Sequence, residues 1–400
     1  MGMRVLILGG GFAGISAVRE LAKRKPRGLE ADVVLIDQRD SSVFAPLLPD
    51  LISRPLRADH LLYPLKPMCE SLGVEFVQAE VLQVDRGARE VVTTAGTYGG
   101  DCVIICLGCE TDYHGSESAR RGAVGLKRVT EARTIRTAAL RALNDQNEPR
   151  TNVKPVHLLV VGGGYTGFEV ANHLSLLRDA QRVPSDRLRL TILETSGKVL
   201  PGCSDRVRRK ATAEAEKCGI AVRTNTTIGE FRDGTTAELT DGTRVSNAVV
   251  VWAAGVTPGQ WAEGFDVPRR QGGRLAVDEY LRVPGSEGVF AAGDAAGATR
   301  RGSEEPLRMA VQFSLAGGSC AARNAVRWTQ GKALEVFSPF DPGYVVPLGR
   351  GQAVGRVLGR ELSGVVPYSL HYFMCVVRTW GRRNKRGLIA DAARSMMWKE

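Results

Sequence analysis

Two glycine-rich turns carry the residues whose types and spacing point most directly to chemistry. The first reads Gly9-Gly10-Gly11-Phe12-Ala13-Gly14 and follows an apolar run at residues 3–8. In a GxGxxG turn the first glycine makes a tight bend, the second lets the backbone approach a pyrophosphate, and the third lets helix and strand pack closely. The start of the following helix presents N–H groups to the phosphates. We therefore predict a phosphate-binding turn at residues 9–14.

An acidic strand end completes this first unit. The run ADVVLID ends on Asp37, where a carboxylate can accept hydrogen bonds from ribose hydroxyls. The order of strand, glycine turn, helix and acidic strand end predicts a dinucleotide site that has everything FAD needs. Its predicted binding residues are Gly9, Gly11, Phe12, Ala13, Gly14 and Asp37.

The same unit recurs further along the chain. Residues 156–161 lead into Gly162-Gly163-Gly164-Tyr165-Thr166-Gly167, a helical stretch follows, and the strand LRLTILE ends on Glu194. The predicted binding residues are Gly162, Gly164, Gly167 and Glu194, and they suit NAD(P)H. Glu194 favours NADH because a carboxylate repels the 2′-phosphate of NADPH, although Lys198 is a nearby cation that could soften this preference. Two complete units predict two bound dinucleotides, or two Rossmann-like halves.

Two apolar strands and a third carboxylate fit the same arrangement. The runs DCVIICLG and AVVVWAAG end on Gly108 and Gly255, and we interpret them as matching crossover strands. Asp294 follows the apolar strand VFAAG, directly after Gly293. Its carboxylate can bind the ribityl chain or a sugar hydroxyl of a flavin. The alternative interpretation is an ordinary helix cap.

Length, composition and cysteines limit the remaining possibilities. The 400 residues predict two or three domains, and 43% hydrophobic with 24% charged residues excludes disorder as the main state. We expect neither a spanning helix nor a signal peptide. The net charge of +11 is spread out, so we expect no nucleic-acid partner. The pair Cys106 and Cys109 ends a strand and does not start a helix, so we expect reduced, mostly buried thiols and no metal site.

The order of these motifs resembles the type II NADH dehydrogenases. The resemblance covers residues 3 to about 390 and rests on these segments: GGGFAG, SSVFAPLLPDLIS, DCVIICLGCETDYHG, VVGGGYTGFEVANHL, VVVWAAGVTP, GRLAVDEYLRVPG and FAAGDAAG. It implies an α/β fold with two Rossmann-like dinucleotide-binding domains, a glutathione-reductase-like architecture and a C-terminal extension. Members of that family are monotopic membrane enzymes that pass two electrons from NADH through FAD to a quinone.

The resemblance also implies roles for single residues. Ala45, Pro46 and Leu47 match a loop close to the flavin ring. Glu169 matches a glutamate near the nicotinamide and the flavin, and the alternative is a first-turn acid that answers the helix dipole. Gln312 matches the first glutamine of a quinone motif, whereas the second is replaced by Ala316. We therefore predict Glu169 and Gln312 as catalytic. Further predicted cofactor-binding residues are Pro46, Leu47, Val81, Gly108, Gly255, Gly293, Asp294 and Val311.

The C-terminal residues allow two interpretations. The run PYSLHYFMCVVRTW predicts a helix of about 14 residues, which is too short to span a membrane. Five cations and then an apolar face follow, which together describe an interfacial anchor. The alternative is a helix packed on its own domain or on a dimer partner. The cations are Arg378, Arg382, Arg383, Lys385 and Arg386, and the face is Leu388, Ile389, Ala392, Ala393, Met396 and Met397.

The predicted organisation has five parts. They are a first FAD-binding part at 1–110, a helical connector at 111–149, an NADH-binding domain at 150–265, a second FAD-binding part at 266–335 and a docking or membrane-anchoring segment at 336–400. The predicted enzyme is cytoplasmic or peripheral on the inner face of the membrane, with NADH and a quinone-type molecule as partners and a homodimer as an option.

Three alternative functions stay open at this stage. One is a soluble FAD-dependent tailoring oxidoreductase that acts on a quinone-like metabolite. Another is sulfide:quinone or disulfide chemistry, which requires suitably placed cysteines. The third is an NADH-sensing or structural flavoprotein without turnover.

Overall fold

The computed structural model describes residues 2–25, 28, 30–147, 155–184, 187–262, 265 and 267–397. The chain divides into two compact units, each assembled from three stretches of sequence. Unit 1 comprises Met1–Ser42, Tyr63–Glu110 and Val256–Asp341. Unit 2 comprises Val43–Leu62, Thr111–Gly255 and Pro342–Glu400. Residues 43–62 and 342–400 therefore fold with the second glycine-rich unit, which differs from the predicted boundaries.

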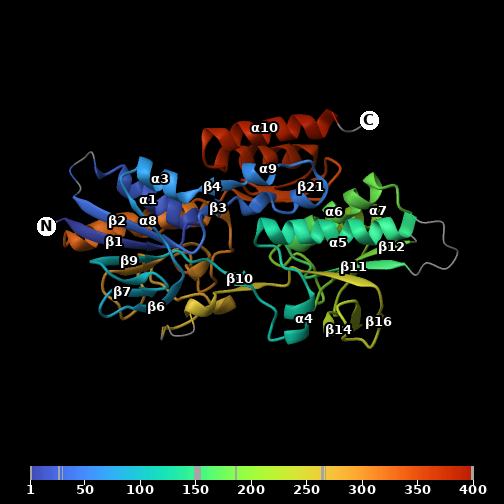
Figure 1. The fold of residues 1–400 in the computed structure, drawn as a ribbon, viewed down its shortest axis with the longest axis horizontal. Helices are drawn as coiled ribbons and strands as arrows, with labels where there is room; N and C mark the ends of the chain where they lie inside the picture. The colour runs from blue at the N-terminus through green and yellow to red at the C-terminus, as the bar shows by residue number, and fades with distance from the viewer. Residues whose placement is uncertain are drawn as a thin grey trace. The chain divides into compact units, whose positions relative to one another are not determined.

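Unit 1 is built on a five-stranded parallel sheet with the order β19-β9-β1-β2-β5. β1, β2 and β9 carry near-continuous apolar runs because a parallel sheet is covered on both faces. Figure 1 shows α1 and α3 on one side of this sheet and β6 and β7 on the other. The sheet strands are β1 (Met3–Leu8), β2 (Ala31–Asp37), β5 (Glu75–Gln78), β9 (Cys102–Ile105) and β19 (Val289–Ala291). The helices are α1 (Phe12–Ala22), α3 (Leu65–Ser71) and α8 (Val311–Thr329).

A smaller antiparallel sheet and several short elements complete unit 1. The sheet has the order β6-β7-β8, with β6 (Val81–Asp85), β7 (Glu90–Thr93) and β8 (Gly96–Gly99). The 3₁₀ turns are η4 (Gln260–Ala262), η5 (Gln271–Gly273) and η6 (Gly293–Ala295). Four short strands fall where the chain passes between units: β3 (Ser41–Val43), β4 (Leu62–Pro64), β10 (Glu110–Thr111) and β18 (Val256–Thr257).

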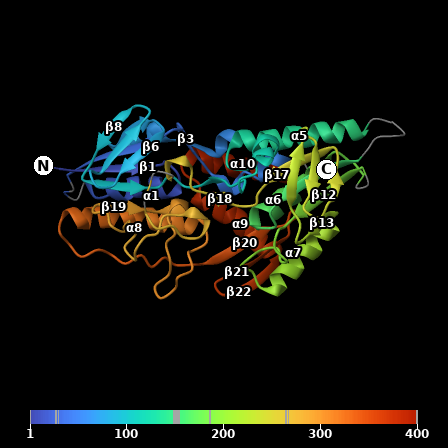
Figure 2. The same ribbon diagram turned by 90° about the horizontal axis from the view of Figure 1, so that it is seen from below.

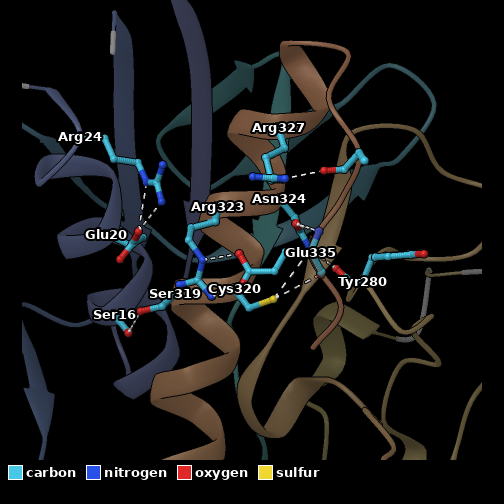
Figure 3. A network of polar contacts seen from close by, with 11 residues as sticks. Ser16, Glu20, Arg24, Tyr280, Ser319, Cys320, Arg323, Asn324, Arg327 and Glu335 are labelled. Carbon is cyan, nitrogen blue, oxygen red and sulfur yellow. Dashed lines mark hydrogen bonds and ion pairs between the residues drawn. The ribbon is translucent and has the colours of Figure 1, made fainter. Parts of the chain in front are cut away.

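Helices α1 and α8 pack closely because small residues meet at their crossing. A Cβ added to Gly318 would lie 2.0 Å from the carbonyl oxygen of Ala13, so only glycine permits this approach. One turn further on, the Ser16 hydroxyl donates to the Leu315 carbonyl at 2.7 Å and lies 2.8 Å from the Ser319 hydroxyl (Figure 3). The start of α8 is thereby held against the start of α1, where the first glycine turn lies.

A buried asparagine fixes the chain that follows α8. The Asn324 side chain is fully buried and donates to the carbonyls of Tyr280 and Glu335 at 2.9 and 2.8 Å. It also accepts from the Glu335 N–H at 2.7 Å. Arg323 forms a bidentate ion pair with the Glu335 carboxylate (Figure 3). These contacts satisfy the polar groups that burial would otherwise penalise, and they hold residues 333–337 beside α8.

Unit 2 contains a four-stranded parallel sheet with the order β13-β12-β11-β17. Its strands are β11 (Val156–Val161), β12 (Leu188–Leu193), β13 (Ile220–Arg223) and β17 (Ala248–Trp252). An antiparallel sheet is formed by β14 (Ile228–Arg232), β15 (Thr236–Leu239) and β16 (Arg244–Val245). The helices of this part are α4 (Glu117–Gly122), α5 (Val129–Asn147), α6 (Tyr165–Ala180) and α7 (Asp205–Lys217).

The C-terminal part of unit 2 is a three-stranded antiparallel sheet with two helices. β20 (Gly343–Pro347), β21 (Ala353–Val357) and β22 (Arg360–Gly364) lie beside α9 (Val365–Arg378), as Figure 2 shows. α10 (Arg382–Met397) packs on α9 (Figure 1) and on η3 (Ala58–His60). The short elements η2 (Ala45–Leu47) and α2 (Asp50–Ser53) come from the stretch at 43–62.

The predicted apolar face of α10 is only partly an exposed face. Leu388 is buried against its own unit together with Asn384 and Asp391. The Asn384 amide donates to the carbonyls of His60 and Leu62, and the Asp391 carboxylate lies 2.7 Å from His60 Nδ1. Ile389, Ala392 and Ala393 are exposed, and the side chains of Met396 and Met397 lie outside the described residues. α10 is therefore docked by polar contacts that periodicity of apolar residues does not reveal.

Candidate functional site

The first candidate site lies at the carboxyl edge of the parallel sheet in unit 1. The register pairs Leu8 with Ile36 on one side and with Ile105 on the other, so the three strands end level. The N–H of Gly9 donates to the Ile36 carbonyl, and the N–H of Cys106 donates to the Leu8 carbonyl, both at 2.7 Å. The carboxyl edge is where open parallel sheets bind ligands.

The three glycines of the first turn occupy the places that their predicted roles require. Gly9 has a φ of +98°, and a Cβ there would lie 2.4 Å from the Cys106 carbonyl oxygen. A Cβ on Gly14 would lie 1.8 Å from the Gly9 carbonyl oxygen, so the helix could not start here with a larger residue. Gly11 is exposed, and a Cβ on it would meet no described atom within 4 Å. The turn thus presents open backbone to an approaching phosphate and fits the pyrophosphate of FAD, with Phe12 and Ala13 opening the helix behind it.

The Asp37 carboxylate braces this turn. One of its oxygens accepts from the Gly10 N–H at 2.6 Å and the other from the Arg39 N–H at 2.7 Å. Burial raises the pKa of Asp37, and these two N–H donors oppose the rise. The Ala79 N–H donates to the Asp37 carbonyl at 3.0 Å, which brings the start of β6, with Val81, to the same edge.

The loop after β9 meets the loop that carries Asp294. Gly108 has a φ of +69°, and the next residue, Cys109, donates through its thiol to the Asp294 carbonyl at 3.2 Å. Asp294 is the middle residue of η6, whose N-cap is Ala292, so its interpretation as a helix cap is wrong. A Cβ on the neighbouring Gly293 would lie 2.9 Å from the Ala13 side chain. Asp294 therefore sits beside the glycine turn and lines a pocket at the start of α8.

The second candidate site repeats this construction in unit 2. Val161 pairs with Leu193 and with Trp252, and the Gly162 N–H donates to the Leu193 carbonyl at 2.7 Å. Gly162 has a φ of +108°. A Cβ on Gly167 would lie 1.8 Å from the Gly162 carbonyl oxygen, whereas one on Gly164 would meet no described atom within 4 Å. The two turns are thus alike in each of the features on which phosphate binding depends.

The Glu194 carboxylate braces the second turn as Asp37 braces the first. One oxygen accepts from the Gly163 N–H at 2.8 Å, and the other accepts from the Ser196 N–H at 2.8 Å and the Ser196 hydroxyl at 2.9 Å. Partial burial raises the pKa of Glu194, but these donors outweigh it and hold the pKa below its ordinary value. Glu194 is therefore a fixed negative charge at the strand end.

The glycine that follows β17 lies against a histidine. Gly255 has a φ of +142°, and a Cβ on it would lie 3.4 Å from His114 Nε2. That nitrogen is 2.9 Å from the Ala254 carbonyl, and the other ring nitrogen is 3.2 Å from the Asp112 carboxylate. The turn at 254–255 is thus held at the carboxyl edge of the sheet, beside the second glycine turn.

Apart from Glu169, the remaining predicted residues fall on two elements, α8 and η2. Val311 is the first residue of α8, and Gln312 and Ala316 are half-buried one turn apart on it. Spacing of four residues puts their side chains on the same face of the helix. Pro46 and Leu47 lie in η2 of unit 2, where Leu47 is buried.

Glu169 belongs to a polar cluster that sequence analysis did not reveal. It is the fifth residue of α6 and lies beyond the first turn, so its interpretation as a first-turn acid is contradicted. Burial, and then the charge of Asp50, raise the pKa of Glu169 to about 8. Asp50 on α2 is only 4% exposed and contacts His173 on α6 and Tyr372 on α9. One feature of the sequence could have predicted part of this cluster: Glu169 and His173 are four residues apart and therefore lie on one face of a helix.

The cysteines are not arranged for disulfide chemistry. None of the eight, which all lie within the described residues, is in a disulfide. Burial raises the pKa of Cys106 to about 12, which keeps it a thiol, and Cys109 is engaged with Asp294. A redox-active pair needs a lowered thiol pKa, so Cys106 is unsuited to that role.

Two braced glycine turns, each at the carboxyl edge of its own parallel sheet, define an α/β protein of the class that binds two dinucleotides. The chain belongs to the pyridine nucleotide-disulphide oxidoreductase family, whose sequence model matches residues 3–317.

The relatives of the chain include type II NADH:quinone oxidoreductases. The protein of that name from Staphylococcus saprophyticus is 29% identical over 369 residues, which span 90% of this chain and 91% of the relative. The structure of NDH2 from Plasmodium falciparum in complex with NADH has a TM-score of 0.86 at 17% identity and covers 100% of this chain and 99% of that one. A sulfide:quinone oxidoreductase from Aquifex aeolicus has a TM-score of 0.78 at 15% identity, covering 99% and 94%. The resemblance read from the motifs is thus confirmed.

Proposed function

We propose that this protein oxidises NADH through bound FAD and passes the two electrons to a quinone-type acceptor. The observation that carries the proposal is the pair of braced glycine turns in one chain, supported by the name of the relatives at 29% identity. FAD, when bound, supplies the chemistry of accepting a hydride and passing electrons on. The residues that would hold it in unit 1 are Gly9, Gly11, Gly14, Asp37 and Asp294.

The chain's own residues bind and discriminate the nucleotide. The open backbone at Gly164 would receive the pyrophosphate of NADH at the start of α6. Glu194 would accept from the ribose hydroxyls and repel the extra phosphate of NADPH, because its carboxylate stays ionised. The predicted preference is therefore for NADH.

Two residues suit the acceptor half of the reaction. Reducing a quinone to a quinol requires two electrons and two protons. The hydride of NADH is equivalent to two electrons and one proton, so one further proton is needed. Glu169, with its pKa near 8, holds a proton at neutral pH and could donate this further proton. Gln312 would offer one amide hydrogen bond to a quinone oxygen. Ala316, one turn later on α8, offers none.

We also propose that the protein binds to the surface of a membrane. Among the described residues, no helix is both long and apolar enough to cross one. α9, however, exposes a row of apolar side chains, with Val366 at 70% and Phe373 at 63% exposure and Val377 further along. Arg382, Arg383 and Arg386 at the start of α10 are exposed cations. Each cation near an anionic lipid surface contributes about 1 kcal/mol to binding.

The test of the function is direct. Protein produced with ample flavin should be yellow and carry about one FAD per chain, as the single complete FAD unit implies. NADH should bleach the flavin in a single anaerobic turnover, and menadione or a ubiquinone analogue should restore its colour. A colourless protein that binds no FAD would refute the proposal.

The tailoring-oxidoreductase alternative is favoured by one observation, the loss of the second glutamine at Ala316. If NADH bleaches the flavin but no quinone restores it, and the protein does not float with anionic liposomes, this alternative takes first place. A homodimer stays a prediction that a sedimentation measurement would test.

A further inference from the structure

A cluster of titratable side chains is buried in unit 2 where three helices meet. Asp50 and Arg54 come from α2 and the residue after it, His173 from α6, and Tyr372 from α9. The Asp50 carboxylate accepts from the Tyr372 hydroxyl at 3.0 Å and forms an ion pair with Arg54, whose Nε lies 3.1 Å away. Its other oxygen lies 3.6 Å from His173 Nε2. Asp50 is thus held from three directions.

The orientation of each partner is fixed in turn. His173 is 3% exposed, and its Nδ1 lies 2.7 Å from the Ser53 hydroxyl, so a neutral ring can accept from Ser53 and point Nε2–H at Asp50. The Arg54 guanidinium lies over the ring of Tyr372 at 4.5 Å and donates to the Tyr368 hydroxyl. An ion pair held this way, and largely out of water, keeps both charge and position.

The cluster contains a single ion pair among neutral groups. Burial lowers the pKa of His173 to about 4, and it also lowers the pKa of His371. Burial raises the pKa of Tyr372 and of Cys375. At neutral pH these four groups are therefore uncharged, which leaves Asp50 and Arg54 as the charges of the cluster core.

We propose that Asp50 is a positioning residue for Glu169, and that its charge, fixed by Tyr372, Arg54 and His173, adds to burial in keeping Glu169 in the protonated form that can donate to an acceptor. The proposal rests on the proposed function, and it adds a reason why the Glu169 carboxyl stays protonated. Glu169 and His173 are one turn apart on α6, and His173 Nε2 lies 3.6 Å from the Asp50 carboxylate, so Asp50 packs against the helix face that carries Glu169. The charge of Asp50 accordingly adds to burial in raising the pKa of Glu169. A like charge nearby disfavours ionisation.

Other titratable groups surround the face of α6 that carries Glu169. Burial, and then the nearby carboxyl groups of Asp50 and Glu169, raise the pKa of Cys375, which stays a neutral thiol. The remaining groups from α2, α5, α6 and α9 are Arg54, Arg136, His173, His371, Tyr372 and Arg378.

The experiment is an infrared titration of the FAD-loaded protein. The carbonyl stretch of protonated Glu169 is isolated by subtracting the spectrum of Glu169→Gln, and its midpoint is followed against pH. The wild-type midpoint should lie near pH 8. Asp50→Asn should move it down by about one pH unit, because a like charge is removed. Asp50→Glu, which keeps the charge, should leave the midpoint close to the wild-type value.

A second variant guards against failure of Asp50→Asn to fold. Asp50→Ala removes the same charge, so it should move the midpoint in the same direction by a similar amount. Tyr372→Phe removes the hydroxyl that holds Asp50 but keeps the charge and its ion pair with Arg54, so it should not lower the midpoint. Tyr98→Phe in β8 of unit 1 is the matched control and should move nothing. If neither Asp50→Asn nor Asp50→Ala lowers the midpoint, the proposal is overturned.

The pH dependence of turnover gives a second test, because a purely structural role of Asp50 would not change it. The alkaline limb of NADH:menadione activity should shift down in Asp50→Asn, whereas NADH:ferricyanide activity, which delivers no proton to its acceptor, should keep its pH profile. A wild-type protein that reduces no quinone would refute the proposed function only, because the infrared midpoint still decides the role of Asp50.

Discussion

The clearest consequence of the two glycine turns is that each can be blocked without disturbing the fold. Gly164 has φ −80° and ψ −170°, a conformation that alanine adopts freely, and its Cβ would meet no described atom within 4 Å. Gly164→Ala should therefore change the free energy of unfolding by less than about 0.5 kcal/mol. The added methyl group would instead occupy the space that the NADH pyrophosphate needs.

The size of the binding defect follows from the contacts that are lost. A hydrogen bond from a backbone N–H to a charged phosphate contributes about 1.5–3 kcal/mol. Losing one such bond should raise the dissociation constant of NAD⁺ by about 10- to 150-fold. The FAD content should not change, because Gly164 lies in unit 2 and the FAD turn lies in unit 1.

The assay is calorimetric titration of NAD⁺ into the FAD-loaded variant, with a thermal melt for stability. Gly11→Ala is the equivalent substitution in the first glycine turn, and it should weaken FAD binding while unit 2 still binds NAD⁺. Gly167→Ala is the opposite control, because its Cβ would lie 1.8 Å from a carbonyl oxygen, so it should lower the melting temperature. An unchanged NAD⁺ dissociation constant in Gly164→Ala would refute the assignment of this turn to the pyrophosphate.

Three further outcomes are expected. Glu194→Arg should shift the preference of flavin reduction from NADH toward NADPH, and equal rates with both nucleotides in the wild type would show that Glu194 does not reach the ribose. Gln312→Ala should impair menadione reduction by up to about tenfold, the worth of one neutral hydrogen bond, while ferricyanide reduction holds; an equal loss in both would place Gln312 in support of the flavin. Phe373→Asp, at an exposed position, should weaken co-flotation with anionic liposomes at low salt and leave NADH:ferricyanide activity intact, whereas wild-type protein that does not float would contradict the membrane proposal.

Deletion of the chain beyond Trp380 would be a poor test of membrane binding. It would remove α10, whose Asn384, Leu388 and Asp391 are buried against unit 2. Such a deletion would expose those partners, His60 among them, and confuse docking with membrane contact. A substitution on the exposed row of α9 avoids this difficulty.

The sequence by itself determined the two glycine turns and the carboxylate that ends the second strand of each unit, but not that these carboxylates hydrogen-bond to the turns. Each turn is decided by residues within one strand-turn-helix unit: the contact that excludes a side chain from Gly14 is made by Gly9, five residues earlier. The acid that closes each unit, Asp37 or Glu194, bonds back to the middle glycine of its own turn. Local spacing suffices for the glycine turns because Gly9 and Gly14 are only five residues apart, at the end of a strand and the start of a helix.

Only the tertiary structure decided what surrounds Glu169 and how α10 docks. Asp50, His173 and Tyr372 are far apart in the sequence, and no periodicity links them, yet burial among three helices brings Asp50 into contact with both of the others. α10 likewise carries Asp391 on its buried side, where apolar spacing predicted none, because His60 supplies a polar partner there. Burial turns isolated polar residues into a cluster, and burial is a property of the whole fold.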